Sequence, residues 1–251
     1  MAIHHLAPEL LSREVRVAVI GAGGTGSQML MGLAQLHTAM LALGHPGGLD
    51  VTVIDADQVS EANVGRQMFY PSDVGLPKAT VLVNRINMAM GTGWKAETRR
   101  VTAAESLRTD LAIGCVDNRL ARKAILESVA RSGGGYWLDL GNTEAQAQVV
   151  LGQPKWPRCP LRQEWERLPC VTELFRELLA RDQRLDEEHQ PSCSVALSLA
   201  SQGLFVNDLA VRWAGQLLYE LLCAGRLRQH GVLINLTSKR CGPIDIDPQV
   251  W

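Results

Sequence analysis

The chain has 251 residues, of which 46% are hydrophobic and 20% are charged, as is usual for a soluble globular protein. Its 25 Lys and Arg nearly balance its 26 Asp and Glu, which leaves a net charge of -1. This charge gives no strong attraction to a phosphate backbone or an anionic membrane, so nucleic acid is not the expected partner.

Signals for export, membrane insertion and zinc binding do not occur in this sequence. Residues 1–17 lack the cationic start, apolar run and cleavage site of a signal peptide, and no apolar stretch reaches membrane-spanning length. We therefore expect a cytoplasmic protein that has no membrane partner. The six cysteines form no CxxC pair, so we expect reduced thiols and no zinc.

The first predicted elements form a strand, turn, helix and strand unit. Residues Val15–Ile20 are an apolar, β-branched run that predicts a buried strand. The turn GAGGTGS follows, and then a helical pattern from about Ser27 to Leu43. A second strand is expected at Val51–Ile54, and it ends in Asp55.

Later elements continue this alternation. Helices are expected at Lys78–Met90 and from Arg119, with strands near Lys95–Val101 and at Leu111–Val116. Two more strands, Tyr136–Leu140 and Gln146–Leu151, are joined by turn residues that could close a hairpin. The alternation predicts a mostly parallel, Rossmann-like sheet with helices on both faces, and antiparallel strands in the C-terminal half.

We expect one domain over residues 1–251, with its nucleotide-binding half at about 14–131. Residues 153–192 are rich in Pro, Trp and charge and predict a long crossing segment, which in a compact domain is usually functional or mobile. The part from 193 to 251 should hold a helix from about Ser194 to Ala224 and a strand near Val232–Leu236.

The glycine turn indicates a nucleotide site. Its glycines let the backbone approach a ligand closely, and the helix after it offers unpaired N–H groups to a phosphate; they are Gly21, Gly23, Gly24 and Gly26. Asp55 is placed to accept hydrogen bonds from ribose hydroxyls. These features alone fit a nicotinamide-dependent dehydrogenase as well as an ATP enzyme, and the glycines could also serve helix packing only.

Five short elements in fixed order resemble the ThiF/MoeB/HesA family, the bacterial relatives of ubiquitin-activating enzymes. They are GAGGTGS, DAD, NVGRQ, GLPKA and DNRLAR, and they extend from Gly21 to Arg122. The resemblance implies adenylation of a protein's C-terminal carboxylate by ATP and Mg²⁺. Five elements at compatible spacing are far more specific than the glycine turn alone.

The resemblance also implies a role for each matching residue. Asp55 would hold the ribose, and Asp117 would bind the magnesium that bridges the phosphates. The phosphates would be contacted by Asn63, Arg66 and Lys78. Three more residues would support these groups or lie beside them, namely Gln67, Asn118 and Asp57.

The chemistry of adenylation requires this kind of site. Attack of a carboxylate on the α-phosphorus gathers negative charge, so the site needs cations and N–H donors aimed at the phosphates. A general base is unnecessary, because the carboxylate is already ionised at neutral pH. Taken singly, Arg66 and Lys78 would be a solvated surface pair and Asp117 a helix N-cap.

Cys193, in the stretch HQPSCSVALSLASQ, matches the position where this family often carries a cysteine that forms a thioester or persulfide. A helix N-terminus would favour its thiolate. The alternative is a buried structural cysteine. Cys159 and Cys170 are weaker candidates for the same role, and Cys115 is expected in the core.

The PSC turn followed by residues 202–207 resembles the ThiF-like group of the PRTRC system. That resemblance implies a ubiquitin-like small protein with a C-terminal glycine as partner, and the wider family suggests a homodimer. Many members of the family carry an N-terminal helix whose arginine reaches the ATP of a neighbouring subunit. Here the sole arginine before the first strand is Arg13, so this sequence departs from the family pattern at that point. The alternatives are adenylation of a carboxylate on a modified tRNA base, an NAD-dependent oxidoreductase, and a non-catalytic scaffold.

Overall fold

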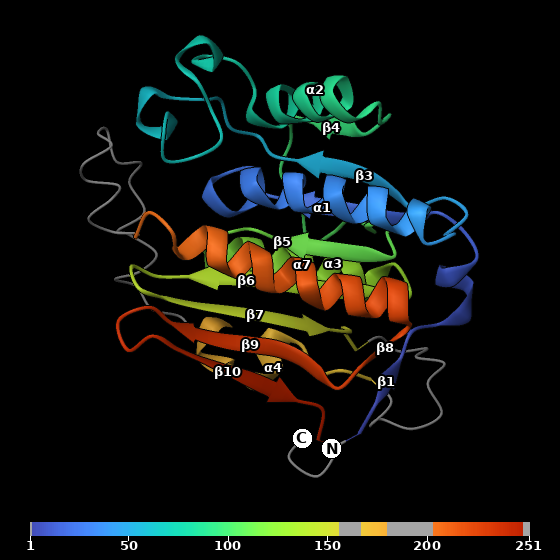
Figure 1. Cartoon of the computed structure of the whole chain (residues 1–251). Helices are drawn as coiled ribbons and strands as arrows, with labels where there is room; N and C mark the ends of the chain where they lie inside the picture. The colour runs from blue at the N-terminus through green and yellow to red at the C-terminus, as the bar shows by residue number, and fades with distance from the viewer. Residues whose placement is uncertain (1, 156–166, 180–202, 248–251) are drawn as a thin grey trace.

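The computed structural model describes residues 2–155, 167–179 and 203–247, and its largest element is a single mixed sheet (Figure 1). The eight strands of this sheet lie in the order β10-β9-β7-β6-β5-β2-β3-β4. Five consecutive strands run parallel to one another, namely β6, β5, β2, β3 and β4. The pairs β6–β7, β7–β9 and β9–β10 are antiparallel. The predicted fold class is confirmed.

The elements alternate between strand and helix in the first half of the chain. In order they are β1 His4–His5, η1 Pro8–Leu11, β2 Val15–Ile20, α1 Gly24–Ala42, β3 Leu49–Ile54, η2 Glu61–Asn63, η3 Pro71–Asp73, α2 Lys78–Met90, β4 Lys95–Glu97, β5 Leu111–Gly114 and α3 Arg119–Arg131. They continue with β6 Tyr136–Asn142, β7 Gln146–Gly152, α4 Val171–Leu174, η5 Arg176–Leu179, α7 Val206–Ala224, β8 Arg226–Leu227, β9 Gln229–Asn235 and β10 Arg240–Asp245.

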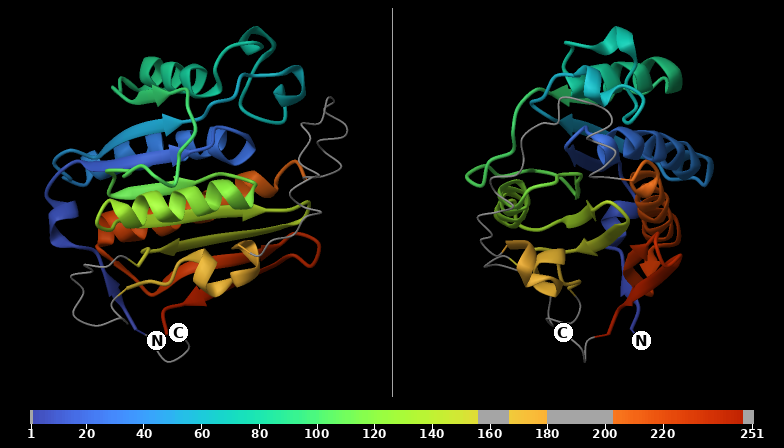
Figure 2. Two further views of the ribbon diagram at one scale, coloured as in Figure 1. Left: turned by 180° about the vertical axis from the view of Figure 1, so that it is seen from behind. Right: turned by 90° about the vertical axis from the view of Figure 1, so that its left-hand side faces the viewer.

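Helices cover both faces of the sheet. The two long helices α1 and α7 lie side by side on one face, and α3 and α4 lie on the other (Figure 2). Strand β2 is central, and its side chains are buried on both faces except for Arg16. Such burial on both faces explains why its sequence is a continuous apolar run rather than an alternating one. No helix in the described ranges is long and apolar enough to span a membrane.

Local signals set most of the helix ends. Asn118 begins α3 as its N-cap, with Oδ1 accepting a hydrogen bond from the Ala121 N–H at 2.9 Å. Helices α2 and α7 each end at a glycine in the left-handed region, Gly91 at φ 68° and Gly225 at φ 69°. These are the positions at which the sequence predicted that the helices end.

Two expected elements differ from the structure, and one strand was not expected. The helix expected from Ser194 begins only at Val206, because residues 203–205 are not helical; residues 194–202 lie outside the described ranges. The strand expected near Lys95–Val101 ends at Glu97. Strand β10 was not predicted, because Pro243 interrupts its pattern; a proline is tolerated there because β10 is an edge strand.

The described part of the crossing segment is packed rather than loose. Leu168 and Cys170 are fully buried and Val171 nearly so. Arg167 donates from Nη1 to the Gln153 carbonyl at 2.6 Å and forms two hydrogen bonds of 2.8 Å with Glu173. Residues 167–174 therefore form a packed segment beside β7.

The amino ends of the strands are joined by a charged cluster on Asp110. Its carboxylate accepts two hydrogen bonds of 2.8 Å from Arg13 and three from the backbone and side chain of Arg16. Arg13 is thus engaged within its own chain, at the sheet edge opposite the glycine turn. The pKa of Asp110 lies well below its usual range, because the hydrogen bonds of the two guanidinium groups outweigh the cost of burial.

This cluster predicts a loss of stability in acid. The folded-state pKa of Asp110 is depressed, so its contribution is complete above the unfolded-state value and is lost as the pH falls through the folded-state value. We expect the Asp110→Asn variant to lose about 1–2 kcal/mol of unfolding free energy at pH 7 and less at pH 2. Urea denaturation between pH 7 and pH 2 measures this difference. An equal deficit at both pH values would contradict the assignment.

Candidate active site

The glycine turn is held against the loop that follows β5. The Cys115 N–H donates to the Ile20 carbonyl at 2.8 Å, and Gly21 has φ +95°. A Cβ at Gly21 would lie 2.5 Å from the Cys115 carbonyl oxygen, and one at Gly26 would overlap the Gly21 carbonyl. Glycine is therefore required at both positions by backbone contact, whatever ligand the turn binds.

The turn leads into the N-terminus of α1 without a side-chain cap. Gly23 is the N-cap residue, and the first helical hydrogen bond joins the Ser27 N–H to the Gly23 carbonyl at 2.9 Å. The preceding N–H groups of the first turn point out of the helix, where they can bind an anion. This is the geometry that the sequence predicted for a phosphate site.

Asp55 lies at the end of β3 and contacts this turn. Its Oδ2 accepts from the Ala22 N–H at 2.5 Å, and its Oδ1 accepts from the Asp57 N–H at 2.7 Å. Burial raises the pKa of Asp55, while the two backbone hydrogen bonds act against that shift. Each carboxylate oxygen keeps a second lone pair, so Asp55 can still accept a ribose hydroxyl.

Lys78 is a buried cation at this edge of the sheet. It is the first residue of α2, and only 8% of it is exposed. Its Nζ lies 3.5 Å from Asp57 Oδ2, and its charge opposes the rise that burial causes in the pKa of Asp55. The alternative interpretation of Lys78 as a solvated surface residue is wrong.

The NVGRQ loop packs onto the first turn of α1. The Met68 N–H donates to Ser27 Oγ at 3.3 Å, and Gln67, which is 8% exposed, has its Nε2 4.0 Å from the Cβ position of Gly23. Asn63 Oδ1 caps the loop by accepting from the Ser60 N–H at 2.9 Å. Gln67 is therefore at the turn, whereas the carbonyl oxygen of Asn63 has a local structural role.

Arg66 is carried by the same loop and is half-buried. Burial lowers the pKa of its guanidinium, which means that the protein removes water from this cation. An anionic ligand beside a partly desolvated arginine is bound more strongly than one beside a solvated arginine. The alternative of a fully solvated surface residue therefore does not fit Arg66.

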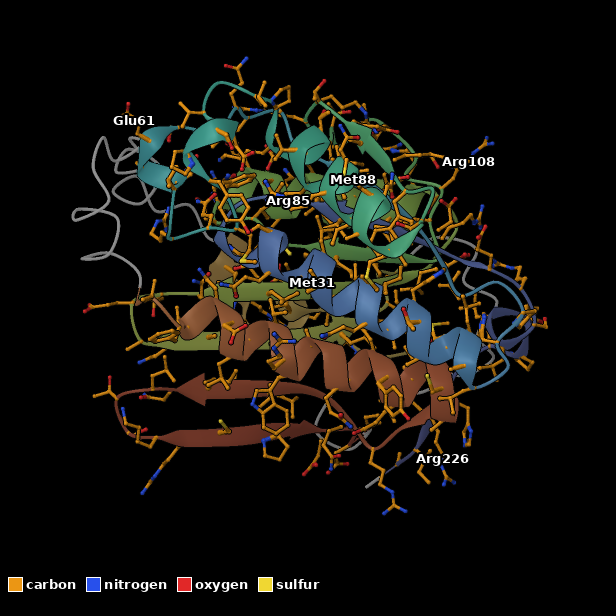
Figure 3. All side chains as sticks on the ribbon, turned by 45° about the horizontal axis from the view of Figure 1, so that its top comes forward. Met31, Glu61, Arg85, Met88, Arg108 and Arg226 are labelled. Carbon is orange, nitrogen blue, oxygen red and sulfur yellow. The ribbon has the colours of Figure 1, made fainter. Side chains whose placement is uncertain are left out.

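Arg85 clamps this loop from α2, and the sequence did not point to it. Its Nη1 donates to the Met68 carbonyl at 2.7 Å, its Nη2 to Asp73 Oδ2 at 2.8 Å, and its guanidinium lies 4.5 Å from the centre of the Tyr70 ring. Figure 3 shows Arg85 on the side of α2 that faces the loop. Arg85 follows Lys78 by seven residues, so both lie on one helical face, and this spacing is the signal that could have found it.

Asp117 and Asn118 follow β5 and are exposed. Asn118, not Asp117, is the N-cap of α3, so the alternative interpretation of Asp117 as a cap is wrong. Asn118 Nδ2 lies 3.3 Å from Asp117 Oδ1 and donates to it, which gives Asn118 the expected supporting role. The Asp117 side chain is exposed at the carboxyl edge of the sheet. It follows Cys115, whose N–H contacts the strand end before the glycine turn, by two residues.

The last residue of the DNRLAR element, Arg122, has a structural role. Arg122 Nε donates to the completely buried Asp139 at 3.2 Å, and its Nη2 donates to the Val116 carbonyl at 3.0 Å. Burial raises the pKa of Asp139, and the charge of Arg122 opposes that shift. Arg122 thereby fixes the loop between β5 and α3 on which Asp117 stands.

The cysteines differ in their surroundings. Cys193 and Cys159 lie outside the described residues. Cys170 is completely buried, and burial raises the pKa of its thiol, so its candidacy as a nucleophile is wrong. Cys115 packs against the core as expected, and burial raises the pKa of its thiol as well.

A magnesium ion fits this edge of the sheet when its other ligands come from the nucleotide. Mg²⁺ at nucleotide sites is usually bound by one or two carboxylates together with substrate phosphates and water. Asp117 offers one exposed carboxylate whose orientation is supported by Asn118. In the described ranges, no group of three or more His, Cys, Asp or Glu is arranged around a common metal position.

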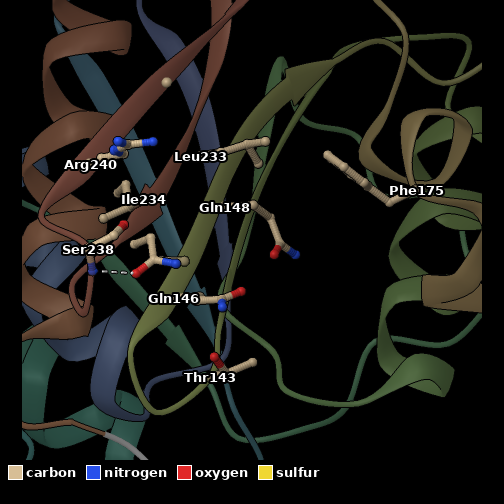
Figure 4. Close-up of a pocket in the computed structure, with 11 residues that line it drawn as sticks. Thr143, Gln146, Gln148, Phe175, Leu233, Ile234, Ser238 and Arg240 are labelled. Atoms are coloured by element: carbon tan, nitrogen blue, oxygen red, sulfur yellow. Dashed lines mark hydrogen bonds between the residues drawn. The ribbon is translucent and has the colours of Figure 1, made fainter.

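A separate cavity of about 520 Å³ lies beside β7, β9 and β10 (Figure 4). In that view Phe175 points from the opposite wall toward Gln148 and Leu233. Among its described lining residues only Arg240 is charged, and none belongs to the predicted phosphate-binding set. The cavity therefore does not compete with the carboxyl edge as a nucleotide site.

Known proteins resemble the chain in both sequence and fold. It is 29% identical over 135 residues to the "Adenylyltransferase and sulfurtransferase UBA4" of Yarrowia lipolytica, which covers 51% of this chain and 31% of that protein. It is 40% identical over 73 residues to the "NEDD8-activating enzyme E1 catalytic subunit" of Arabidopsis thaliana, which covers 29% of this chain and 14% of that protein. The chain thus matches about a third or less of the length of these relatives.

Structural and family comparisons extend the match. The crystal structure of PaaA superposes on 95% of this chain and 65% of its own, with a TM-score of 0.59 and 14% sequence identity, which shows a shared fold. The model of the ThiF family matches residues 9–214, which include the glycine turn, the NVGRQ loop, Lys78 and Asp117. Because this match covers most of the sequence, the chain belongs to the ThiF family.

Proposed function

We propose that this chain uses ATP and Mg²⁺ to adenylate the C-terminal glycine carboxylate of a ubiquitin-like small protein. The observation that carries the proposal is a buried cation at the carboxyl edge of the sheet, Lys78 beside Asp57, next to an uncapped glycine turn on which the NVGRQ loop packs. The names of the two curated relatives, an adenylyltransferase and a NEDD8-activating subunit, agree with this chemistry.

In this proposal each group of residues contacts a different part of the nucleotide. Asp55 accepts the ribose hydroxyls, and the N–H groups at the start of α1 bind phosphate oxygens. Lys78 and Arg66 face the β- and γ-phosphates, which depart together as pyrophosphate. Gln67 lies against the turn on the loop that carries Arg66, and Asn118 orients the Asp117 carboxylate.

The reaction requires no proton transfer. One oxygen of the glycine carboxylate attacks the α-phosphorus, and the bond from that phosphorus to the bridging oxygen of pyrophosphate breaks. The products are an acyl-adenylate and pyrophosphate. Arg66 and Lys78 stabilise the charge that collects on the leaving group. Asp117 would hold the magnesium, which adds positive charge beside the same phosphates.

A second step on Cys193 belongs to the same proposal. Attack of its thiolate on the acyl carbonyl would release AMP and form a thioester, provided that the thiol has first lost its proton to solvent. Hydroxylamine-sensitive labelling of the enzyme by the partner, absent in Cys193→Ser, would reveal this step. Adenylation itself does not depend on it.

Pyrophosphate exchange tests the first step directly. The purified chain with Mg²⁺, ATP, labelled pyrophosphate and a ubiquitin-like protein that ends in glycine should form labelled ATP only when that protein is present. Exchange stimulated by tRNA instead would move the activity to a nucleic-acid carboxylate. Binding of NADH but not of ATP would indicate the oxidoreductase alternative, and ATP binding without any exchange would indicate a scaffold.

Removal of the buried ammonium should lower the exchange rate. We expect Lys78→Met to reduce it by about a hundredfold, because the stem of the side chain stays packed while the charge beside the leaving group is lost. Lys95→Met is the matched control, since Lys95 is an exposed lysine on the neighbouring strand β4, and it should change the rate by less than about twofold. Equal rates for the two variants would contradict the role of Lys78.

A further inference from the structure

A cluster of three polar side chains joins α7 to the glycine turn. Asn207 stands in the first turn of α7 and is 3% exposed, and Thr25 in the first turn of α1 is 7% exposed. Thr25 Oγ1 donates to Asn207 Oδ1 at 3.1 Å, and Asn142 Nδ2, from the end of β6, donates to the same oxygen at 2.5 Å. Thr25 belongs to the GAGGTGS turn, whereas Asn142 and Asn207 lie outside the five sequence elements that indicated the nucleotide site.

The two hydrogen bonds fix which way the Asn207 amide faces. Within the described residues, the hydrogen bonds of its side chain all end at Oδ1. Its Nδ2 lies over Gly24, only 2.5 Å from the position that a Cβ there would take. Asn207 Nδ2 is not one of the fully enclosed, unpartnered polar atoms of the described residues, so its N–H groups stay open at the glycine turn. A largely buried amide held in this way can donate to an acceptor that enters at the turn.

The order of the strands indicates what this acceptor is. Asp55 and Lys78 lie on the β3 side of β2, whereas Asn142 ends β6, which lies on the β5 side of β2. Displacement at phosphorus places the attacking group opposite the leaving group. If pyrophosphate departs toward Lys78, the carboxylate approaches from the side of Asn142 and Asn207.

We infer that Asn207 is a substrate-binding residue whose Nδ2 donates a hydrogen bond to the non-attacking oxygen of the acyl carboxylate. This role rests on the proposed function, and it identifies Asn207 as a residue of that same site that binds the acyl group. After the new bond to phosphorus forms, the same donor faces the carbonyl oxygen of the acyl-adenylate. The amide transfers no proton, and its contribution is to orient the carboxylate for attack.

Two adenosine compounds separate an acyl contact from nucleotide binding. The first, 5′-O-(N-glycylsulfamoyl)adenosine, is a stable analogue of glycyl-adenylate, and the second, AMP, lacks the acyl group. In Asn207→Asp a carboxylate oxygen still accepts from Thr25 and Asn142, but the donor becomes an acceptor that repels the acyl oxygen. Calorimetry should show about tenfold or more weaker binding of the glycyl compound, with AMP unchanged within about twofold.

Two other variants complete the test. Gln216→Asp makes the same change of amide to carboxylate at an exposed position of α7 and should bind both compounds like the wild type. Asn207→Ser removes the amide without adding charge and should show the same selective loss if Asn207→Asp does not fold. A loss that is equal for both compounds, or no loss, would overturn the role of Asn207 while leaving the proposed function intact. Wild-type protein that binds neither compound would remove the proposed function and this role together.

Discussion

Replacing Asp117 with alanine should lower the rate of partner-dependent pyrophosphate exchange by about 10²–10³-fold, the range found when one electrostatic group that stabilises a transition state is removed. The carboxylate is exposed at the carboxyl edge and is not the N-cap of α3, so its removal leaves the helix start intact. The melting temperature should therefore stay unchanged while the exchange rate falls.

The control for this variant is Glu127→Ala, which removes a partly exposed carboxylate from α3, the helix that follows Asp117. Its exchange rate should match the wild type. A titration with Mg²⁺ adds a second readout, because loss of a metal ligand should shift the magnesium dependence to higher concentration. An Asp117→Ala enzyme with normal rate and normal magnesium dependence would exclude Asp117 from the reaction.

Replacing Arg122 with methionine should lower the free energy of unfolding by about 3–5 kcal/mol, because it leaves the buried carboxylate of Asp139 without its cation. The pKa of Asp139, already raised by burial, should rise further. A raised folded-state pKa gives stability that is lost as the pH increases, so the deficit should be larger at pH 8 than at pH 5. Urea denaturation at both pH values measures it.

Two variants test the cause of this loss. Lys123→Met removes an exposed cation from the adjacent position of α3 and should cost less than about 0.5 kcal/mol. The double variant Arg122→Met with Asp139→Leu removes both charges and should recover much of the lost stability. A double variant as unstable as Arg122→Met alone would show that the loss arises from packing rather than from the unpaired charge.

The first half of the fold was predictable because its signals are local. The apolar run of β2, the glycine turn and the pattern of α2 can each be read from a short stretch of consecutive residues, and the structure has β2 and α2 at the predicted bounds. The C-terminal half was less predictable. Strand β10 is exposed along most of its length and contains Pro243, so it carries little of the pattern that marks a buried strand.

The candidate site shows the same division. The sequence indicated Lys78 and Asp117, because each lies within one of the five short elements, GLPKA and DNRLAR. Asn207 could not be found in this way, since its contact with Thr25 joins residues that are 182 positions apart in the chain. The structural role of Arg122 likewise depends on the buried Asp139. That contact arises from the packing of α3 over β6, and no local sequence pattern indicates it.

The ion pair between Lys78 and Asp57 has a consequence for how a ligand enters. The Asp57 side chain is 58% exposed, and the two charged atoms are 3.5 Å apart, so water competes for the carboxylate and the pair contributes less than about 1 kcal/mol. Such a weak ion pair holds the ammonium at the carboxyl edge of the sheet in the absence of an anion, and it costs little to break if, as proposed, a phosphate binds there. The protein thereby avoids much of the ordering cost that a freely moving lysine would add to each binding event.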